Sequence, residues 1–493
     1  MNFSLISLEL AVVILALGVL LGDLWTPAQH KRKLGYAAAA GLLLILLFSI
    51  SARQKFLPAG GGEAVADFAF GKMFVVDGLA TFFKQFFLLA GIIVVVMSVE
   101  FADRIRAGIA EFYSLILIAL AGMLFASSAN DFVLVFVSLE LITITFYILN
   151  SFQRDRINSL EAGIKYLILG AVSTGFFVFG LAFVFGTGGT TNFIELHNLL
   201  VADAALAKQP LFLAGIFFIF MGLAFKLAAF PLQVWAPDVY EGSPAPATAF
   251  LAVGSKAAGI VLLLRVLFVA VPQVTVQWTN ILIVIAAITI LYGNLCALPQ
   301  RSLKRLLGYS SIANAGYLLL GFAALTKTGS SAVLYYLAGY LFTVLAAFTV
   351  IVIVSRQQDS DDISVLAGLN RRSPFLAAVL TLAMVSLAGV PPLAGFFGKF
   401  LLLKSVVEQG AANTVYYVLV GVAIVGVVMS FYYYFGVVRA IYWSKDANEN
   451  EPVVVSVPAR ISLAVCMAGM LYLGLVPEPA IRLTQAAVKA LNI

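Results

Sequence analysis

The apolar residues of this 493-residue chain gather in long stretches that are separated by short polar connections. A helix needs about 20 mostly apolar residues to cross the hydrocarbon core of a membrane. About fourteen stretches meet this criterion. They lie at 5–24, 34–51, 79–99, 112–129, 131–151, 162–186, 210–241, 246–268, 279–298, 303–325, 330–354, 374–407, 413–439 and 457–476. The pattern predicts an all-α polytopic membrane protein.

Two of these stretches, 210–241 and 374–407, are longer than a straight membrane helix requires. Helix-breaking residues interrupt both of them: Pro231 and Pro237 in the first, and Gly389, Pro391, Pro392 and Gly395 in the second. A proline inside a span frees backbone carbonyls, which a membrane interior tolerates only where they are buried in protein or line a water-filled cavity. The sequence therefore predicts two broken helices that face a polar interior.

The two broken helices occupy matching positions along the chain. The segments 112–268 and 279–441 each contain five spans, and the broken helix is the fourth of each five. Because five is odd, the second group enters the membrane from the opposite side, which is the pattern of an inverted repeat with an ion path near the midplane. Residues 1–111 then form an N-terminal three-helix segment, and 442–493 form a C-terminal helix segment.

Composition agrees with a membrane protein and gives little support to bound redox groups. The chain is 62% hydrophobic and 11% charged, against roughly a quarter charged residues in a typical globular domain. Cys296 and Cys466 form no CxxC motif, and His30 and His197 lie in polar connections, which argues against thiolate metal sites and haem ligation. The run GTGGTT at 186–191 lacks the third glycine of a dinucleotide-binding fingerprint.

Lysine and arginine are distributed unevenly between the two sides. Positive residues in short loops are retained on the cytoplasmic side. One set of alternate loops is rich in them: HKRK at 30–33, DRIR at 103–106, QRDR at 153–156, QRSLKR at 300–305, NRR at 370–372, and the segment of Arg439 and Lys445. The other set carries only Arg53, Lys55, Lys72, Lys208 and Lys327. We therefore expect both termini on the non-cytoplasmic side, with the first span uncleaved, and this bias accounts for most of the +6 net charge.

Several charged residues fall inside predicted spans, among them Glu140, Lys165, Lys226, Lys256 and Lys399. At roughly 2.5 to 3.5 kcal/mol each, their insertion would cost more than about 10 kcal/mol. Three other cations, Lys84, Arg265 and Lys404, lie near span ends, where we expect their long side chains to reach the interface. Lys165 could do the same.

Among these five residues, four are lysines and only Glu140 is a carboxylate. A structural ion pair between Glu140 and one lysine leaves the other ammonium groups without a partner. Such a group must be solvated by internal water or be neutral, because desolvation disfavours the charged form of an amine. The pattern therefore favours a row of groups that take up and release protons over a purely structural ion pair.

The residues around these charges resemble a known family. FKLAAFPLQVWAPDVYEGSPAPATAFLAVGSKAAG at 225–259 is similar to the core signature of the antiporter-like membrane subunits of NADH:quinone oxidoreductase, respiratory complex I, and its WAPDVYEGSPAP form resembles the subunit N branch. Further similar runs are VSLELITITFYIL (137–149), EAGIKYLILGAVS (161–173), RLLGYSSIANAGYLL (305–319) and GVPPLAGFFGKF (389–400). These runs extend from the fourth to the thirteenth span.

The resemblance implies fourteen helices with two inverted five-helix repeats and a polar axis across them. In this axis Glu140 pairs with Lys226, protons pass by way of Lys256 to the exit-side Lys399, and Lys165 tunes the pair. Related subunits often have histidine where this chain has Asn314, so Asn314 with Ser310 and Ser311 would hold water rather than carry a proton.

The resemblance also implies partners and a location. NADH, FMN, iron–sulfur clusters and quinone would belong to other membrane and peripheral subunits of the complex, with no cofactor or metal on this chain, in a bacterial plasma membrane. The hypothesis is that opening of the Glu140–Lys226 pair pushes a proton toward Lys256. The alternatives are a subunit of a multisubunit Na+/H+ antiporter or membrane-bound hydrogenase, and a structural scaffold with an inactive axis.

Overall fold

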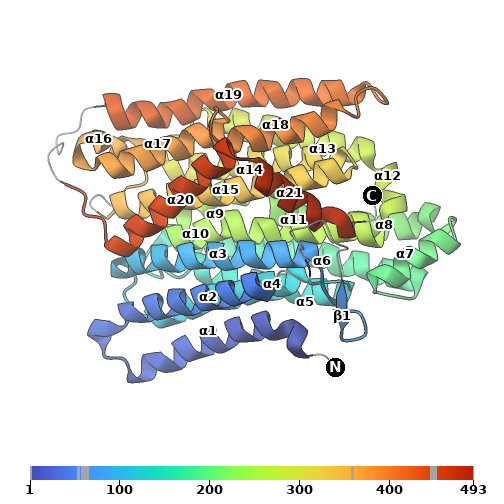
Figure 1. Ribbon diagram of the computed structural model, residues 1–493, viewed down its shortest axis with the longest axis horizontal. Helices are drawn as coiled ribbons and strands as arrows, with labels where there is room; N and C mark the ends of the chain where they lie inside the picture. The colour runs from blue at the N-terminus through green and yellow to red at the C-terminus, as the bar shows by residue number, and fades with distance from the viewer. Residues whose placement is uncertain (1–2, 53–55, 57–65, 357–359, 445–451, 492–493) are drawn as a thin grey trace.

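The computed structural model describes residues 3–52, 56, 66–356, 360–444 and 452–491, and almost all of them are helical. Arg53, Lys55 and Lys445, used above for the charge asymmetry, lie outside the described residues. Most of the helices lie nearly parallel to the long axis of the view in Figure 1. The first three are α1 (Ser7–Trp25), α2 (Arg32–Ala52) and α3 (Gly78–Phe101). A short antiparallel hairpin, β1 (Asp67–Ala69) and β2 (Phe74–Val76), precedes α3.

The first group of five predicted spans is present in the expected order. It comprises α4 (Ile109–Ser127), α5 (Phe132–Asn150), α6 (Ile157–Gly188), α8 (Pro210–Leu227) with α9 (Ala236–Gly242), and α10 (Ala245–Phe250) with α11 (Lys256–Arg265). Two π-helical turns, Leu251–Ser255 and Val266–Ala270, join and extend α10 and α11, so Lys256 directly follows a π turn. The short helices α7 (Phe193–Ala202) and α12 (Pro272–Gln277) lie in the connections.

The second group repeats this order. It comprises α13 (Thr279–Ala297), α14 (Leu303–Ala323), α15 (Lys327–Val354), α17 (Pro374–Ala388) with α18 (Ala394–Val407), and α19 (Val415–Trp443). The one-turn helix α16 (Leu369–Arg372) precedes α17, and α20 (Val457–Leu475) and α21 (Glu478–Ala487) follow the group. The broken helix is the fourth of each five, as predicted. The exact domain boundaries at 111, 268 and 441 stay a prediction.

The first break separates α8 from α9. Helix α8 ends at Leu227, Ala228 takes a left-handed conformation with φ of 56°, and the Phe230–Pro231 peptide bond is cis. The backbone N–H of Phe230 donates to Oγ1 of Thr289 at 3.1 Å, which satisfies one backbone group freed by the break. The prediction that Pro237 also interrupts the helix was wrong. Pro237 lies in the first turn of α9, where the missing N–H of proline costs no helical hydrogen bond.

The second break separates α17 from α18. Gly389 ends α17 with φ of 87°, a conformation that favours glycine, and Pro391 and Pro392 follow. Gly395 was predicted to contribute to this break, but it lies inside α18. Its role is close packing instead, because a Cβ atom at this position would overlap the backbone oxygen of Ser386 in α17.

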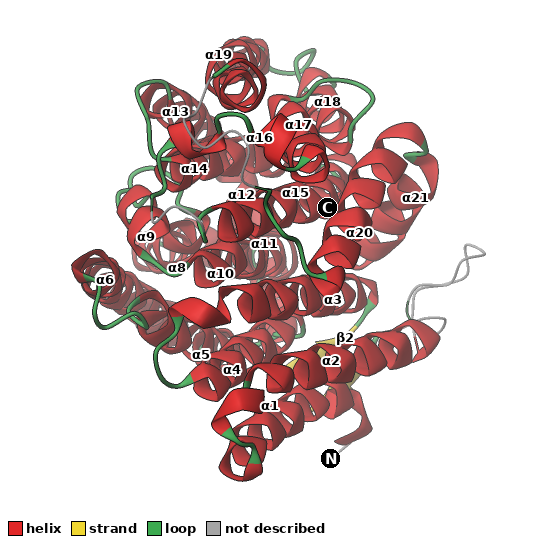
Figure 2. Cartoon of the chain, turned by 90° about the vertical axis from the view of Figure 1, so that its left-hand side faces the viewer, coloured by secondary structure: helices red, strands yellow, loops and turns green. Residues whose placement is uncertain are grey.

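Thirteen helices of the described chain are long and apolar enough to cross a membrane. The fourteenth predicted span is the broken pair, since α17 and α18 have only 15 and 14 residues and neither reaches the length of a span alone. This confirms a multi-pass, all-α architecture. In Figure 2 the helices of the second group, with α13, α14 and α19, lie at the opposite end of the molecule from α1, α4 and α5. Helices α9, α10, α14 and α15 join the two groups, because α9 packs on α14 and α10 on α15.

Candidate functional site

Lys226 lies in the last turn of α8, directly before the first break, and its side chain is buried. Its ammonium donates to the hydroxyl of Thr143 on α5 and, at 3.4 Å, to that of Tyr166 on α6. The Tyr166 ring centroid lies 5.6 Å from Nζ, within the range of a cation–π contact. The end of α8 also places the positive charge where the helix dipole favours a cation. Lys226 is therefore held by polar groups from two other helices.

Glu140 on α5 faces the same small cavity as Lys226, which Thr143, Ser173 and Thr174 also line. Its carboxylate Oε1 accepts a hydrogen bond of 2.7 Å from Thr174 on α6. Among the described residues, no ion pair within 4.0 Å joins Glu140 to Lys226. The direct pair implied by the family resemblance is therefore not formed in this structure. Instead, Glu140 binds Thr174 and Lys226 binds Thr143.

Lys256, at the start of α11, is buried, and its hydrogen bonds among the described residues go to Ser311 of the second group. Its ammonium donates to the backbone oxygen of Ser311 at 2.6 Å and also to the Ser311 hydroxyl. The same hydroxyl lies 2.8 Å from the hydroxyl of Tyr240 on α9. Ser311 of α14 thus connects Tyr240, in the second half of the first broken helix, to Lys256 of α11.

The predicted hydration residues Ser310 and Asn314 contact tyrosines. The Ser310 hydroxyl lies 2.5 Å from that of Tyr434 on α19. Tyr336 on α15 donates to the Asn314 side-chain oxygen at 2.5 Å, and the Asn314 amide donates to Ser310 at 3.3 Å. All of these groups are buried. Ser310 and Asn314 therefore anchor tyrosine side chains between α14, α15 and α19.

Lys399 on α18 is buried against the second break. Its ammonium donates to the backbone oxygens of Leu387 and Ala388 at 2.7 and 3.3 Å, which are carbonyls freed at the end of α17. The Tyr317 ring centroid lies 4.9 Å from Nζ. The lysine thus satisfies the helix end that the break exposes.

Lys165 lies apart from Glu140 and Lys226. Its side chain is 40% exposed, and Nζ pairs with Glu161 at 2.7 Å and with Asp238 at 2.6 Å. Arg305 of α14 pairs with the same Asp238 and with Glu241, both on α9, each at 2.8 Å. The described residues thus place Lys165 in a charged cluster on the outer side of α9, and its tuning of the Glu140–Lys226 pair stays a proposal.

The expectation that Lys84 and Arg265 reach the interface was wrong. Both side chains are buried, because each finds a carboxylate from another element: Lys84 pairs with Glu9 of α1 at 2.8 Å, and Arg265 pairs with Asp77 at 2.9 Å. Glu9, inside the first apolar stretch, was the sequence signal that could have revealed the first pair. Lys404 is 58% exposed, in agreement with the expectation for an interfacial side chain.

Sequence reasoning also missed the tyrosines between the lysines. Six buried tyrosines contact the lysines or their serine and asparagine partners: Tyr166, Tyr240, Tyr317, Tyr336, Tyr340 and Tyr434. A tyrosine hydroxyl both donates and accepts a hydrogen bond, so buried tyrosines usually have a polar partner. Tyrosines inside apolar spans were therefore the available signal. Within the described residues, no group of three or more His, Cys, Asp or Glu side chains could hold a metal ion.

Comparison with known proteins places the chain among membrane transport subunits. Residues 129–430 match the family model described as NADH:quinone oxidoreductase/Mrp antiporter, TM. NADH-quinone oxidoreductase subunit N of Desulforamulus reducens is 39% identical, with 99% of this chain and 98% of the relative covered. The subunit N of Moorella thermoacetica is 38% identical, with 97% and 96% covered.

Solved structures agree with these matches. A chain of respiratory complex I from Thermus thermophilus is similar with a TM-score of 0.78 and 32% identity, covering 96% of this chain and 97% of that chain. A chain of the Mrp complex from Dietzia has a TM-score of 0.83 at 19% identity, covering 100% and 98%, which is a likeness of fold alone.

Proposed function

Since the chain belongs to the family of NADH:quinone oxidoreductase and Mrp antiporter transmembrane subunits, we propose that it is a proton-translocating membrane subunit of an NADH:quinone oxidoreductase. Its similarity to subunit N relatives over the full chain supports this assignment. As a subunit it forms part of an oxidoreductase, while NADH, FMN, iron–sulfur clusters and quinone are bound by partner subunits. The complex would lie in a bacterial plasma membrane, with both termini of this chain on the non-cytoplasmic side.

The observation that carries the proposal is a set of three buried lysines that form no ion pair with any carboxylate of the described residues. Lys226, Lys256 and Lys399 bind hydroxyls, backbone carbonyls and aromatic faces. A buried charge is costly unless it is paired, and these groups reduce the cost only in part. A side chain held in this way can give up its proton and regain it. Lys84 differs, because Glu9 lies 2.8 Å away as a carboxylate partner.

The proposed path runs from Lys226 through Lys256 to Lys399. Hydroxyl groups can accept one proton and donate another. In this scheme the hydroxyls of Tyr240 and Ser311 carry the proton to the Lys256 side chain. Beyond Lys256, the Tyr340 ring lies 5.6 Å from Nζ, and the tyrosines bound to Ser310 and Asn314 continue toward the second break. Asn314 does not titrate, and in this scheme it fixes Tyr336.

Glu140 supplies the electrostatic control in this scheme. In the arrangement described above, it binds Thr174 and leaves Lys226 to Thr143. If the carboxylate approached to about 4 Å, the attraction would be roughly 4 kcal/mol at an effective dielectric of 20. Closing the pair would then retain a proton on Lys226, and opening it would release that proton toward Lys256. Redox chemistry in partner subunits would drive the change.

The test is proton pumping by the intact complex in inverted membrane vesicles. Lys226→Ala or Glu140→Ala should remove most NADH-driven acidification, while the assembled complex remains in the membrane. Lys404→Ala is the matched control, since this exposed lysine lies outside the buried row. Normal pumping in both of the first two variants, at normal complex levels, would refute the scheme.

A Na+/H+ antiporter subunit is the second candidate, because the matched family model includes Mrp antiporters and the fold is similar to that of a chain in the Mrp complex. The two candidates differ in their partners. Purification of the native complex through a tag on this chain should recover flavin and iron–sulfur subunits with NADH dehydrogenase activity. Recovery of antiporter subunits alone would favour the second candidate.

A further inference from the structure

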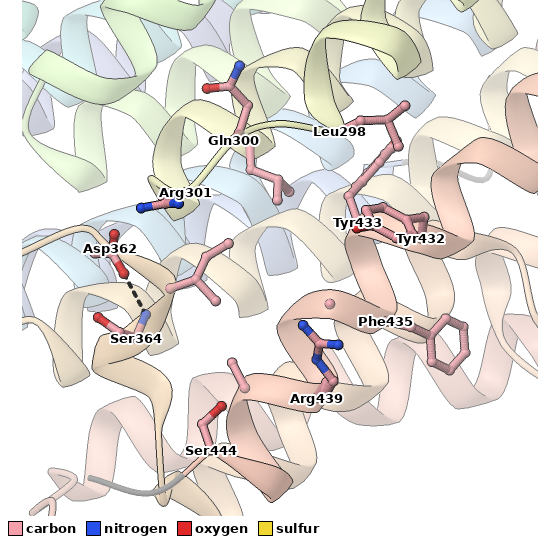
Figure 3. Close-up of a pocket in the computed structure, with 14 residues that line it drawn as sticks. Leu298, Gln300, Arg301, Asp362, Ser364, Tyr432, Tyr433, Phe435, Arg439 and Ser444 are labelled. Carbon is pink, nitrogen blue, oxygen red and sulfur yellow. Dashed lines mark hydrogen bonds between the residues drawn. The ribbon is translucent and has the colours of Figure 1, made fainter. Parts of the chain in front are cut away.

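A cavity of about 560 Å³ opens beside α19, away from the lysine row. Three elements bound it: the connection from α13 to α14, the one-turn helix Ile363–Leu366, and the C-terminal half of α19. Arg301 comes from the connection and Arg439 from α19. In Figure 3 the Arg439 side chain points from its helix toward the connection that carries Arg301. Two segments far apart in the sequence therefore bring two guanidinium groups to one cavity.

In the described part of the chain, no side chain binds either guanidinium directly, although Arg301 lies close enough to Asp362 for the two charges to interact. Neither guanidinium forms an ion pair within 4.0 Å or a hydrogen bond in that part of the chain. The neighbouring Arg305 differs, since it binds Asp238 and Glu241. Both unpaired arginines are exposed to the cavity side, so an external ligand can reach them.

One carboxylate lies on the rim. Asp362 accepts a hydrogen bond of 2.8 Å from the backbone N–H of Ser364. Hydrogen bonds from Ser364, aided by the charge of Arg301, hold the pKa of Asp362 below its usual value, so it is ionised at neutral pH. Two arginines and one aspartate leave the cavity with a charge of +1, which matches a ligand with a single negative charge.

Gln300, Ser364 and Ser444 add polar groups to the wall, while aromatic residues of α19 face outward at one side of the cavity. Tyr432 is 73% and Phe435 43% exposed, and Trp443 at the end of the helix is 74% exposed. Exposed aromatic side chains at a span end are typical of the membrane–water interface. Gly436 also lines the cavity, and the space beside it is open, because a Cβ atom there would meet nothing within 4 Å. The cavity therefore opens at Gly436 and Phe435 onto the exposed apolar face of α19, which also carries Val428 and Tyr432.

We propose that this cavity binds an anionic phospholipid, with the phosphate between Arg301 and Arg439 and an acyl chain along the exposed apolar face of α19, starting at Gly436. Guanidinium groups bind phosphate through paired, charge-assisted hydrogen bonds. Basic pockets between membrane helices at the headgroup level are suited to such lipids. The exposed apolar face of α19 beside the arginines favours a lipid over free phosphate, because only a lipid has acyl chains to cover it. The proposal does not rest on proton translocation by the chain.

The experiment uses the complete native complex in phosphatidylcholine nanodiscs that contain a minor fraction of photoactivatable phosphatidylglycerol. Labelled peptides are then measured by mass spectrometry. Wild-type complex should be labelled on α19 near Gly436, and excess inorganic phosphate should not compete. Arg301→Gln with Arg439→Gln should reduce labelling by about tenfold or more, as expected for loss of charge-assisted contacts. Arg154→Gln, an exposed loop arginine outside the cavity, is the control for charge.

A second variant tests the apolar contact without changing charge. Gly436→Trp should fill the open side of the cavity and reduce labelling, whereas Gly421→Trp should not, because Gly421 lies on α19 outside the cavity with similar open space beside it. Three results would overturn the proposal: labelling that persists in the double arginine variant, full competition by inorganic phosphate, or an unlabelled wild-type site that crosslinks to a partner subunit. The first would show an unspecific contact, the second a phosphate site, and the third a protein interface.

Discussion

Replacement of Ser311 by alanine tests the connection between the two halves of the chain. The variant retains the backbone oxygen that binds Lys256 at 2.6 Å but removes the hydroxyl that contacts both Lys256 and Tyr240. A hydrogen bond to a charged group contributes about 1.5 to 3 kcal/mol. If proton transfer depends on this hydroxyl, its loss should slow the transfer by about ten- to a hundredfold. Lys256 itself should stay in place.

The assay compares the number of protons pumped per NADH oxidised in vesicles that contain the complete complex. Ser311→Ala should lower this ratio strongly, and Ser311→Thr should restore it by returning a hydroxyl. Ser98→Ala is the control, because this buried serine on α3 donates to the Val94 carbonyl of its own helix. An unchanged ratio in Ser311→Ala, with normal assembly, would refute a path through this hydroxyl.

Two further predictions concern stability. Lys84→Met should lower the yield of assembled complex measured on native gels, because removal of one partner of a buried pair costs about 3 to 5 kcal/mol. Adding Glu9→Leu should restore the yield, since no unpaired charge then remains. No recovery in the double variant would contradict this account. Gly395→Ala should reduce the thermal stability of the complex, because the added Cβ overlaps the backbone of Ser386, while Gly421→Ala should not. Equal melting temperatures of the two variants would show that α17 and α18 move apart without loss of stability.

The spans and both breaks could be predicted because they depend on local properties of the chain. A run of about 20 apolar residues has few alternatives to a membrane helix. The prolines at 231, 391 and 392 break helices wherever they occur inside a span. Pro237 and Gly395 were misassigned because a proline in a first helical turn and a glycine at a close helix contact depend on where the helix restarts.

The buried lysines could also be found from the sequence, but their partners could not. Which side of a helix faces protein is decided by tertiary packing, so the sequence shows Glu9 inside an apolar stretch but does not specify Lys84 as its partner. The same reason explains the missed tyrosines, since Tyr240 and Ser311 are 71 positions apart. The open Glu140–Lys226 pair depends on side-chain choices among threonines that no spacing rule specifies.

The contact of Lys399 with the end of α17 has a mechanical consequence. An ammonium donates stronger hydrogen bonds than a neutral amine, so the carbonyls of Leu387 and Ala388 are held most firmly when Lys399 carries its proton. Deprotonation loosens the joint between α17 and α18. The rigidity of the segment between α17 and α18 therefore depends on whether Lys399 is protonated. Amide hydrogen exchange at residues 388–394 should become faster when Lys399 loses its proton.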